Sequence, residues 1–107
     1  MQSAPPPANP LPMPPLFMDF AGKRYAINVQ RFIIGRERGA CHLVIPDPNV
    51  SRQHAAVEFV NGVFFIVDLG SRNGIGYNGH RVHRKQISEG DRFDIHSHQL
   101  RFSFKHP

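Results

Sequence analysis

The chain has 107 residues and a single cysteine, Cys41, so we expect one domain without an intrachain disulfide or a cysteine-paired zinc site. Thirteen Lys and Arg residues against eight Asp and Glu residues give a net charge of +5, which favours an anionic partner such as nucleic acid, phosphorylated protein or acidic lipid, with a generic basic surface as the alternative. The sequence has neither an apolar run of membrane-spanning length nor a secretory signal, so we expect a cytoplasmic protein, nuclear if the source is eukaryotic.

The first predicted segment, residues 1–15, is rich in proline. Seven of the ten prolines of the chain lie in it, and it has no charged residue. Proline breaks helices and cannot donate to a strand ladder, so we expect a linker or disordered leader. Docking to an SH3- or WW-type domain is the alternative. The folded domain is predicted to cover residues 16–107.

Short β-strands are predicted along the rest of the chain. Apolar, β-branched and aromatic runs bounded by turn residues occupy residues 16–20, 23–29, 31–34, 42–45, 54–60, 63–69, 92–95 and 99–104. Asn61-Gly62 is typical of a type I′ hairpin, and residues 70–79 are dense in turn residues. Because no helical period is visible, about nine to eleven short strands are expected in an all-β sandwich or barrel.

Two patterns that suggest enzymes lack the remaining parts of those sites. Residues 74–79 match G-x-G-x-x-G, but no apolar helix or βαβ unit follows, so we interpret these glycines as turn residues. Ser51 and His54 could pair as nucleophile and base, but no orienting acid or oxyanion hole is predicted. We therefore expect no enzyme activity, and we expect His54 to stabilise the preceding turn.

Two close histidine pairs, His80 with His83 and His96 with His98, are the candidate metal ligands. His96 and His98 would share a face if both lay in one strand. No carboxylate or cysteine completes either site, so we expect surface histidines, with no metal and no cofactor.

The most informative pattern is a set of three polar loops that follow or connect predicted strands, at residues 35–37, 45–55 and 68–74. Such loops expose backbone N–H groups and can form a concave anion site. If the loops meet at one end of a sandwich, they gather Arg36, Ser51, Arg52, Arg72 and Asn73. Guanidinium groups, a hydroxyl and loop amides match the acceptors of a phosphate dianion. Ordinary turns with solvated arginines are the alternative.

In these loops the sequence resembles a forkhead-associated (FHA) domain, over about residues 16–105. The matching motifs are Ile34-Gly35-Arg36, Asp47-Pro48-x-Val50-Ser51-Arg52-x-His54-Ala55, Asp68-Leu69-x-Ser71-x-Asn73-Gly74, Asn78-Gly79 and Gly90-Asp91. The resemblance implies an eleven-stranded, two-sheet β-sandwich. It also implies a non-catalytic module that binds phosphothreonine-containing protein segments through loops at one end, in a Ser/Thr kinase pathway. The proline-rich leader ahead of one recognition domain suggests a part of a larger signalling or scaffold protein.

The resemblance further implies a role for each matching residue. Arg36 would contact the phosphate, and Ser51 would donate its hydroxyl to it. Asn73 would hold the peptide main chain beside the phosphothreonine. Arg52, at a position that varies in the family, and Arg72, where Thr is common, would touch phosphate or peptide. Four more residues would support the site: Gly35, His54, Gly74 and Asn78.

The sequence departs from the family pattern in two places. Residues 75–77 replace the usual Thr, aromatic and Val or Leu, and Tyr77 is expected to supply the displaced aromatic ring. The turn at residues 95–98 lacks the usual Gly, and its two histidines, His96 and His98, could tune specificity or pH response.

Two other functions stay open from the sequence. One is phospho-independent protein association, including self-association, which occurs in some FHA domains. The other is nucleic-acid binding through the basic loops and Tyr77, which predicts a steep salt dependence and tolerance of Arg36 loss. No basic and aromatic stripe follows a strand face, so the second is the weaker alternative.

Overall fold

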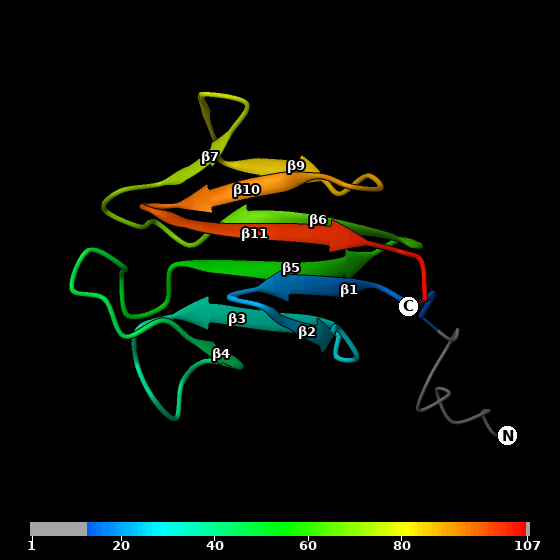
Figure 1. The fold of residues 1–107 in the computed structure, drawn as a ribbon, viewed down its shortest axis with the longest axis horizontal. Coiled ribbons are helices and arrows are strands. Elements are labelled where there is room, and N and C mark those ends of the chain that lie inside the picture. The colour runs from blue at the N-terminus through cyan, green and yellow to red at the C-terminus, as the bar shows by residue number, and fades with distance from the viewer. Residues whose placement is uncertain (1–12, 107) are drawn as a thin grey trace, which may run out of the picture.

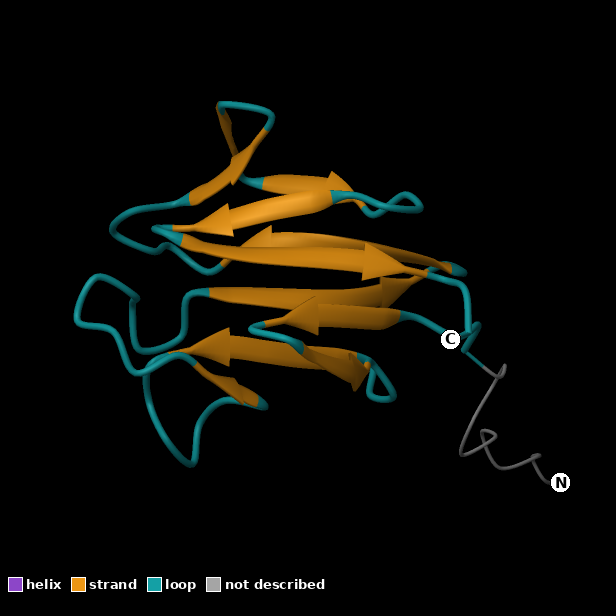
Figure 2. Ribbon diagram, viewed as in Figure 1, coloured by secondary structure: helices purple, strands orange, loops and turns teal. Residues whose placement is uncertain are grey.

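The computed structural model describes residues 13–106, which form two β-sheets packed face to face (Figure 1). Figure 2 shows strands and loops and no helix in this part of the chain. The predicted all-β, two-sheet sandwich is therefore confirmed. Most of the predicted proline-rich leader, residues 1–12, lies outside the described residues.

Six strands form one sheet and five form the other. The first sheet contains β1 (Phe17–Phe20), β2 (Lys23–Ala26), β7 (Ile75–Tyr77), β8 (His80–Val82), β10 (Arg92–Ile95) and β11 (His98–Ser103). Their order in space is β2-β1-β11-β10-β7-β8. The second sheet contains β3 (Arg31–Gly35), β4 (Leu43–Val44), β5 (Ala55–Val60), β6 (Val63–Asp68) and β9 (Arg84–Gln86), in the order β4-β3-β5-β6-β9.

The core lies between the sheets and consists of alternating apolar side chains. In β10 and β11, the side chains of Phe93, Ile95, Leu100 and Phe102 are completely buried. Arg92, which precedes Phe93 in β10, is exposed to solvent. This alternation is what a strand with one buried face requires. The packed core fixes the strand ends from which the polar loops leave.

Tight turns close the hairpins. Asn61 and Gly62 both have positive φ values, 52° and 85°, as a type I′ turn requires. The turn prediction for this dipeptide is confirmed.

Strands β7, β8 and β9 lie where the sequence indicated turns or no regular structure. Gly76 lies inside β7 and pairs with Asp94 of β10, so its interpretation as a turn residue is wrong. Gly79 does occupy a turn, with φ of 79°. These strands have only three residues each. Pairing of β7 with β10, of β8 with β7 and of β9 with β6, rather than intrinsic propensity, orders them.

The polar loops gather at one end of the sandwich. The connections β3–β4, β4–β5, β6–β7 and β10–β11 all lie at the left end in Figure 1, and the described part of the chain begins and ends at the right. The described residues contain no helix long and apolar enough to cross a membrane.

Candidate anion-binding site

An open depression of about 150 Å³ lies among the polar loops. Its lining comprises Arg36, Pro48, Asn49, Val50, Ser51, Arg52 and Arg72. Four of the five binding residues predicted from the sequence thus line one depression, and the fifth, Asn73, contacts its wall through Asn49. The sequence reasoning missed Pro48, Asn49 and Val50 as lining residues. They lie in the same predicted loop as Ser51, residues 45–55, and that position was the signal that could have found them.

Gly35 sets how closely the first two loops approach each other. A Cβ added at Gly35 would lie 2.9 Å from the carbonyl carbon of Arg52 and 2.9 Å from Cα of Gln53. Both are backbone atoms, which cannot rotate away as the end of a side chain could. The Arg36 amide consequently donates to the Ser51 carbonyl at 3.0 Å, which fixes β3 against the loop that carries Ser51.

His54 connects the second loop to the third. Its ring is completely buried, with Nδ1 accepting a hydrogen bond from the Ser51 amide at 3.0 Å and Nε2 lying 2.7 Å from the Gly74 carbonyl. Because Nδ1 accepts from an amide, the ring hydrogen is on Nε2, which donates to Gly74. One side chain therefore holds both Ser51 and Gly74 in place.

Ser51 presents its hydroxyl toward the depression. The Arg72 amide donates to Ser51 Oγ at 3.1 Å, which occupies one acceptor position of the hydroxyl. A hydroxyl has one hydrogen to donate and a second lone pair. The Ser51 hydrogen is therefore available to an anionic ligand.

Arg36 is oriented by a hydrogen bond at one edge of its guanidinium. Its Nε donates to the Val50 carbonyl at 2.9 Å. The terminal nitrogens donate to no protein acceptor among residues 13–106. An oriented guanidinium with free terminal N–H groups suits bidentate recognition of phosphate or carboxylate.

Asn73 fixes the wall of the depression. Its Nδ2 donates to the Asn49 carbonyl at 2.6 Å. The Asn49 amide and side chain in turn donate to Asp47 Oδ1 at 2.8 and 3.2 Å. The Asn73 side chain retains its carbonyl oxygen, and Nδ2 retains a second hydrogen for a ligand main chain.

Gly74 leaves room for the side chain of Arg81, from β8. A Cβ on Gly74 would overlap the Arg81 guanidinium, and the φ of Gly74 is 77°. Arg81 Nη2 donates to the Ser71 carbonyl at 3.3 Å, and the guanidinium lies 4.0 Å from Asp68. Asn78 lies in the turn between β7 and β8 and lines no part of the depression. It closes the hairpin that positions Arg81.

The β10–β11 turn contacts the second loop through His98. His98 Nε2 lies 2.7 Å from Asp47 Oδ2. The Asn49 amide and His98 both lower the pKa of Asp47, so its carboxylate is the favoured form. His96 does not share a strand face with His98, because it lies in the turn with φ of 56°. The described residues contain no cluster of three His, Cys, Asp or Glu side chains that could hold a metal.

Tyr77 supplies an aromatic ring to the first sheet. Its ring lies 5.1 Å from that of Phe93, and its hydroxyl donates to Asp91 Oδ1 at 3.0 Å. The Tyr77 ring thus packs against the core of the sandwich.

Comparison with known proteins places the fold and loops in one family. A sequence model of the FHA domain matches residues 32–96. The glycogen accumulation regulator GarA of Mycolicibacterium smegmatis is 32% identical over 82 residues, which are 77% of this chain and 51% of GarA. A homologue of the protein phosphatase 1 regulatory inhibitor subunit PPP1R8 from Arabidopsis thaliana is 44% identical over 52 residues, which are 48% of this chain and 14% of that protein. The chain thus spans about half of GarA and a small part of the plant protein.

A solved structure gives the same result for the fold. Mycobacterium tuberculosis EmbR, in complex with a low affinity phosphopeptide, matches with a TM-score of 0.79 and 26% identity, over 84% of this chain and 24% of EmbR. The family match covers more than half of the chain and includes the strands and loops that form the depression. The chain therefore belongs to the FHA domain family.

Proposed function

We propose that this domain binds phosphothreonine-containing protein segments, without catalysing a reaction on them, through the depression between its loops. FHA domains are non-catalytic modules that bind phosphopeptides. One observation of this chain carries the proposal: three arginines, the Ser51 hydroxyl and no carboxylate side chain line one depression.

Phosphate chemistry explains why these groups would discriminate a modified from an unmodified threonine. The modification adds a charge of about −1.5 to −2 and three strong acceptor oxygens. Hydrogen bonds to a charged group contribute roughly 1.5–3 kcal/mol each. Two such bonds, made only with the phosphate, give a preference of about a hundredfold or more.

Each residue has a role in this proposal. Arg36 and the Ser51 hydroxyl bind the phosphate, and Asn73 holds the peptide main chain. Arg52 and Arg72 contact the phosphate or the residues beside it. Gly35, His54, Gly74 and Asn78 support the loops. The EmbR structure, which contains a phosphopeptide, supports this use of the fold.

The chemistry of the depression also suggests the class of biological partner. It is a protein segment phosphorylated on threonine by a Ser/Thr kinase, and the domain serves within a signalling or scaffold assembly. We place that assembly in the cytoplasm, or in the nucleus of a eukaryotic cell.

Fluorescence anisotropy with labelled degenerate peptide pools tests the proposal. The pools carry phosphothreonine, phosphoserine, phosphotyrosine or unmodified threonine at the central position, and the proteins are the unaltered domain, Arg36→Ala and Ser51→Ala. We expect selective binding of phosphothreonine, and a loss of at least about tenfold in each variant, as expected when a charged hydrogen bond is removed.

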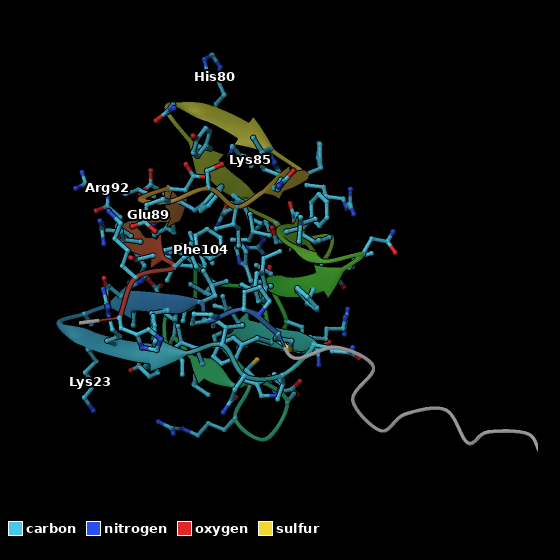
Figure 3. All side chains as sticks on the ribbon, turned by 90° about the vertical axis from the view of Figure 1, so that its right-hand side faces the viewer. Lys23, His80, Lys85, Glu89, Arg92 and Phe104 are labelled. Carbon is cyan, nitrogen blue, oxygen red and sulfur yellow. The ribbon has the colours of Figure 1, made fainter. Side chains whose placement is uncertain are left out.

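Arg92→Ala is the matched control. Arg92 lies at the end of the sandwich opposite the depression, the end that faces the viewer in Figure 3, and its substitution also removes one positive charge. It should bind like the unaltered domain. Equal binding of all pools, with Arg36→Ala folded and as active as the unaltered domain, would contradict the proposal and favour phospho-independent association or nucleic acid.

A further inference from the structure

We infer that His98 and Asp47 form a positioning pair that sets how tightly the domain holds a phosphothreonine segment, although neither side chain lines the depression. The inference rests on the proposed function and adds two positioning residues to it. It concerns one turn of the second loop, residues 47–50, and the contact of that turn with the start of β11.

The turn at residues 47–50 carries the two carbonyl groups that orient proposed ligand-binding side chains. Asn73 Nδ2 donates to the Asn49 carbonyl at 2.6 Å, and Arg36 Nε donates to the Val50 carbonyl at 2.9 Å. A rotation of this turn would move both carbonyls. It would therefore displace the amide proposed for the peptide main chain and the guanidinium proposed for the phosphate.

Asp47 closes this turn with its backbone and with its side chain. Its carbonyl accepts a hydrogen bond from the Val50 amide at 2.9 Å. Its Oδ1 accepts from the Asn49 amide at 2.8 Å and from the Asn49 side chain at 3.2 Å. An aspartate that bonds the backbone two residues on holds a turn only while its carboxylate keeps one orientation.

His98 fixes that orientation through the other carboxylate oxygen. Its Nε2 lies 2.7 Å from Asp47 Oδ2. The Asn49 amide and His98 lower the pKa of Asp47, which favours the ionised carboxylate. An ionised carboxylate only accepts hydrogen bonds, so Nε2 is the donor.

This hydrogen bond connects the two layers of the sandwich. His98 begins β11 of the six-stranded sheet, whereas Asp47 lies between β4 and β5 of the five-stranded sheet. The ring of His98 also lies 6.1 Å from the ring of Phe20 in β1, measured between centroids. The turn at residues 47–50 is thereby held against a packed side chain of the opposite sheet.

The pair is partly shielded, and neither member has a second partner of opposite charge. The side chains of His98 and Asp47 are 27% and 20% exposed. Within residues 13–106, each of them forms its only salt bridge with the other. Removal of the His98 donor therefore leaves Asp47 Oδ2 without a charged partner and the carboxylate free to rotate.

Fluorescence anisotropy at neutral pH tests the inference with the phosphothreonine peptide that binds best among the degenerate pools. His98→Phe keeps an aromatic ring beside Phe20 but removes the donor, whereas His98→Gln keeps an N–H donor near the place of Nε2. We expect His98→Phe to weaken Kd about fivefold, the upper range for a partly exposed charged pair. His98→Gln should recover most of that loss, and Asp47→Ala should lose at least as much as His98→Phe.

His80→Phe is the matched control. His80 is exposed at the start of β8, where Figure 3 shows it pointing away from the body of the domain, and it makes none of these contacts. The same substitution at this position should leave Kd unchanged. Urea unfolding of every variant verifies that the compared proteins are folded.

The variant Asn73→Ala shows whether the effect of His98 passes through the turn. If His98 acts through Asp47 and Asn49, the loss of affinity in the double variant His98→Phe with Asn73→Ala is smaller than the product of the two single losses. In the domain without peptide, ¹⁵N NMR should show the side-chain amide signals of Asn73 displaced in His98→Phe. They should stay in place in His98→Gln and His80→Phe.

Four results would overturn the inference. If folded His98→Phe binds the peptide as tightly as the unaltered domain while Arg36→Ala weakens binding, the proposed function stands and the role of His98 is wrong. If His98→Phe and His98→Gln lose affinity equally, the Nε2 donor does not position the turn. If the losses of His98→Phe and Asn73→Ala multiply, the effect does not pass through the turn. If the unaltered domain binds no phosphothreonine peptide, the proposed function fails together with the inference.

Discussion

At the scale of single residues, buried polar contacts give the loops their shape. His54 is the central case, because one completely buried imidazole bonds the Ser51 amide and the Gly74 carbonyl. Removing it would leave a cavity and two polar groups without partners. The His54 ring therefore connects Ser51 to the third loop through two hydrogen bonds.

His54→Ala should lower the free energy of unfolding by about 2–4 kcal/mol, from the lost packing and the unsatisfied buried groups. Urea unfolding at neutral pH measures this change. His83→Ala, an exposed histidine, should change stability by no more than about 0.5 kcal/mol. Equal stability of the two variants would show that His54 does not hold the loops together.

Gly35→Ala should destabilise the domain by roughly 1–3 kcal/mol, because its Cβ would overlap the backbone of Arg52 and Gln53. Gly76→Ala is the matched control, since Gly76 is also a strand glycine and its added Cβ would find the nearest atom at 3.5 Å. Thermal unfolding compares the two. A Gly35→Ala protein as stable as Gly76→Ala would refute the steric explanation.

The sequence predicted the charged and hydroxyl side chains of the depression better than it predicted the residues that form its wall. Arg36, Ser51, Arg52 and Arg72 were predictable because the proposed phosphate site needs recognisable residue types, and all four line the depression. Asn49 was not, because it contributes a backbone carbonyl to Asn73, and any residue has one.

At the scale of secondary structure, strands that contain apolar runs could be predicted from the sequence. Strands that are ordered only by pairing with adjacent strands could not. In β5, β6 and β10, apolar residues either alternate with polar ones or follow one another. The structure places each of these strands within one residue of its predicted bounds. The three-residue strands β7, β8 and β9 carry little such pattern. They are ordered by pairing, β7 with β10, β8 with β7 and β9 with β6, and these long-range pairings cannot be seen in the local sequence.

Asp91 joins the short strands to the loop that precedes β10. Its side chain is 9% exposed and contacts Lys85 Nζ at 2.7 Å, the Ser88 amide at 2.8 Å and the Tyr77 hydroxyl at 3.0 Å. Burial raises the pKa of Asp91, but the hydrogen bonds from Lys85, Ser88 and Tyr77 outweigh burial and leave the pKa below its ordinary value of 3.8.

This lowered pKa predicts how stability depends on pH. A carboxyl whose pKa is lower in the folded than in the unfolded state stabilises the fold above its unfolded pKa, and loses that contribution as pH falls through the folded value. Asp91→Asn should therefore be less stable than the unaltered domain at pH 7, by on the order of 1–2 kcal/mol for the lost charged hydrogen bonds.

Urea unfolding at several pH values below 7 checks this prediction. The stability difference between the two proteins should shrink as pH falls below the ordinary aspartate pKa of 3.8. A difference that stays constant down to the acid limit would mean that the carboxylate charge of Asp91 does not stabilise the fold.

At the scale of the whole molecule, the sandwich separates the proposed site from the ends of the described chain. The loops with the depression lie at the left of Figure 1, whereas β1 starts and β11 ends at the right. Figure 3 shows the right-hand end, with Glu89, Arg92 and Phe104 labelled on it. A protein attached through either terminus would therefore leave the depression open.

Fusion of a fluorescent protein through a flexible linker tests this arrangement. The fluorescent protein, attached after residue 107 or before residue 1, should leave the phosphopeptide Kd unchanged within about twofold. The fusion neither adds nor removes a contact between the domain and the peptide. A short insertion after Pro48, inside the loop that carries Ser51, should abolish binding. Strong loss of affinity from either terminal fusion would contradict the separation of site and termini.

The most direct test of the central claim is an NMR titration of the ¹⁵N-labelled domain with one phosphothreonine peptide and with its unphosphorylated form. We expect the phosphorylated peptide to shift the amide signals of Arg36, Ser51, Arg72 and Asn73 and to leave signals at the opposite end of the sandwich in place. The unphosphorylated peptide should shift none of them. Shifts confined to another surface, or identical shifts with both peptides, would contradict recognition of phosphothreonine by these loops.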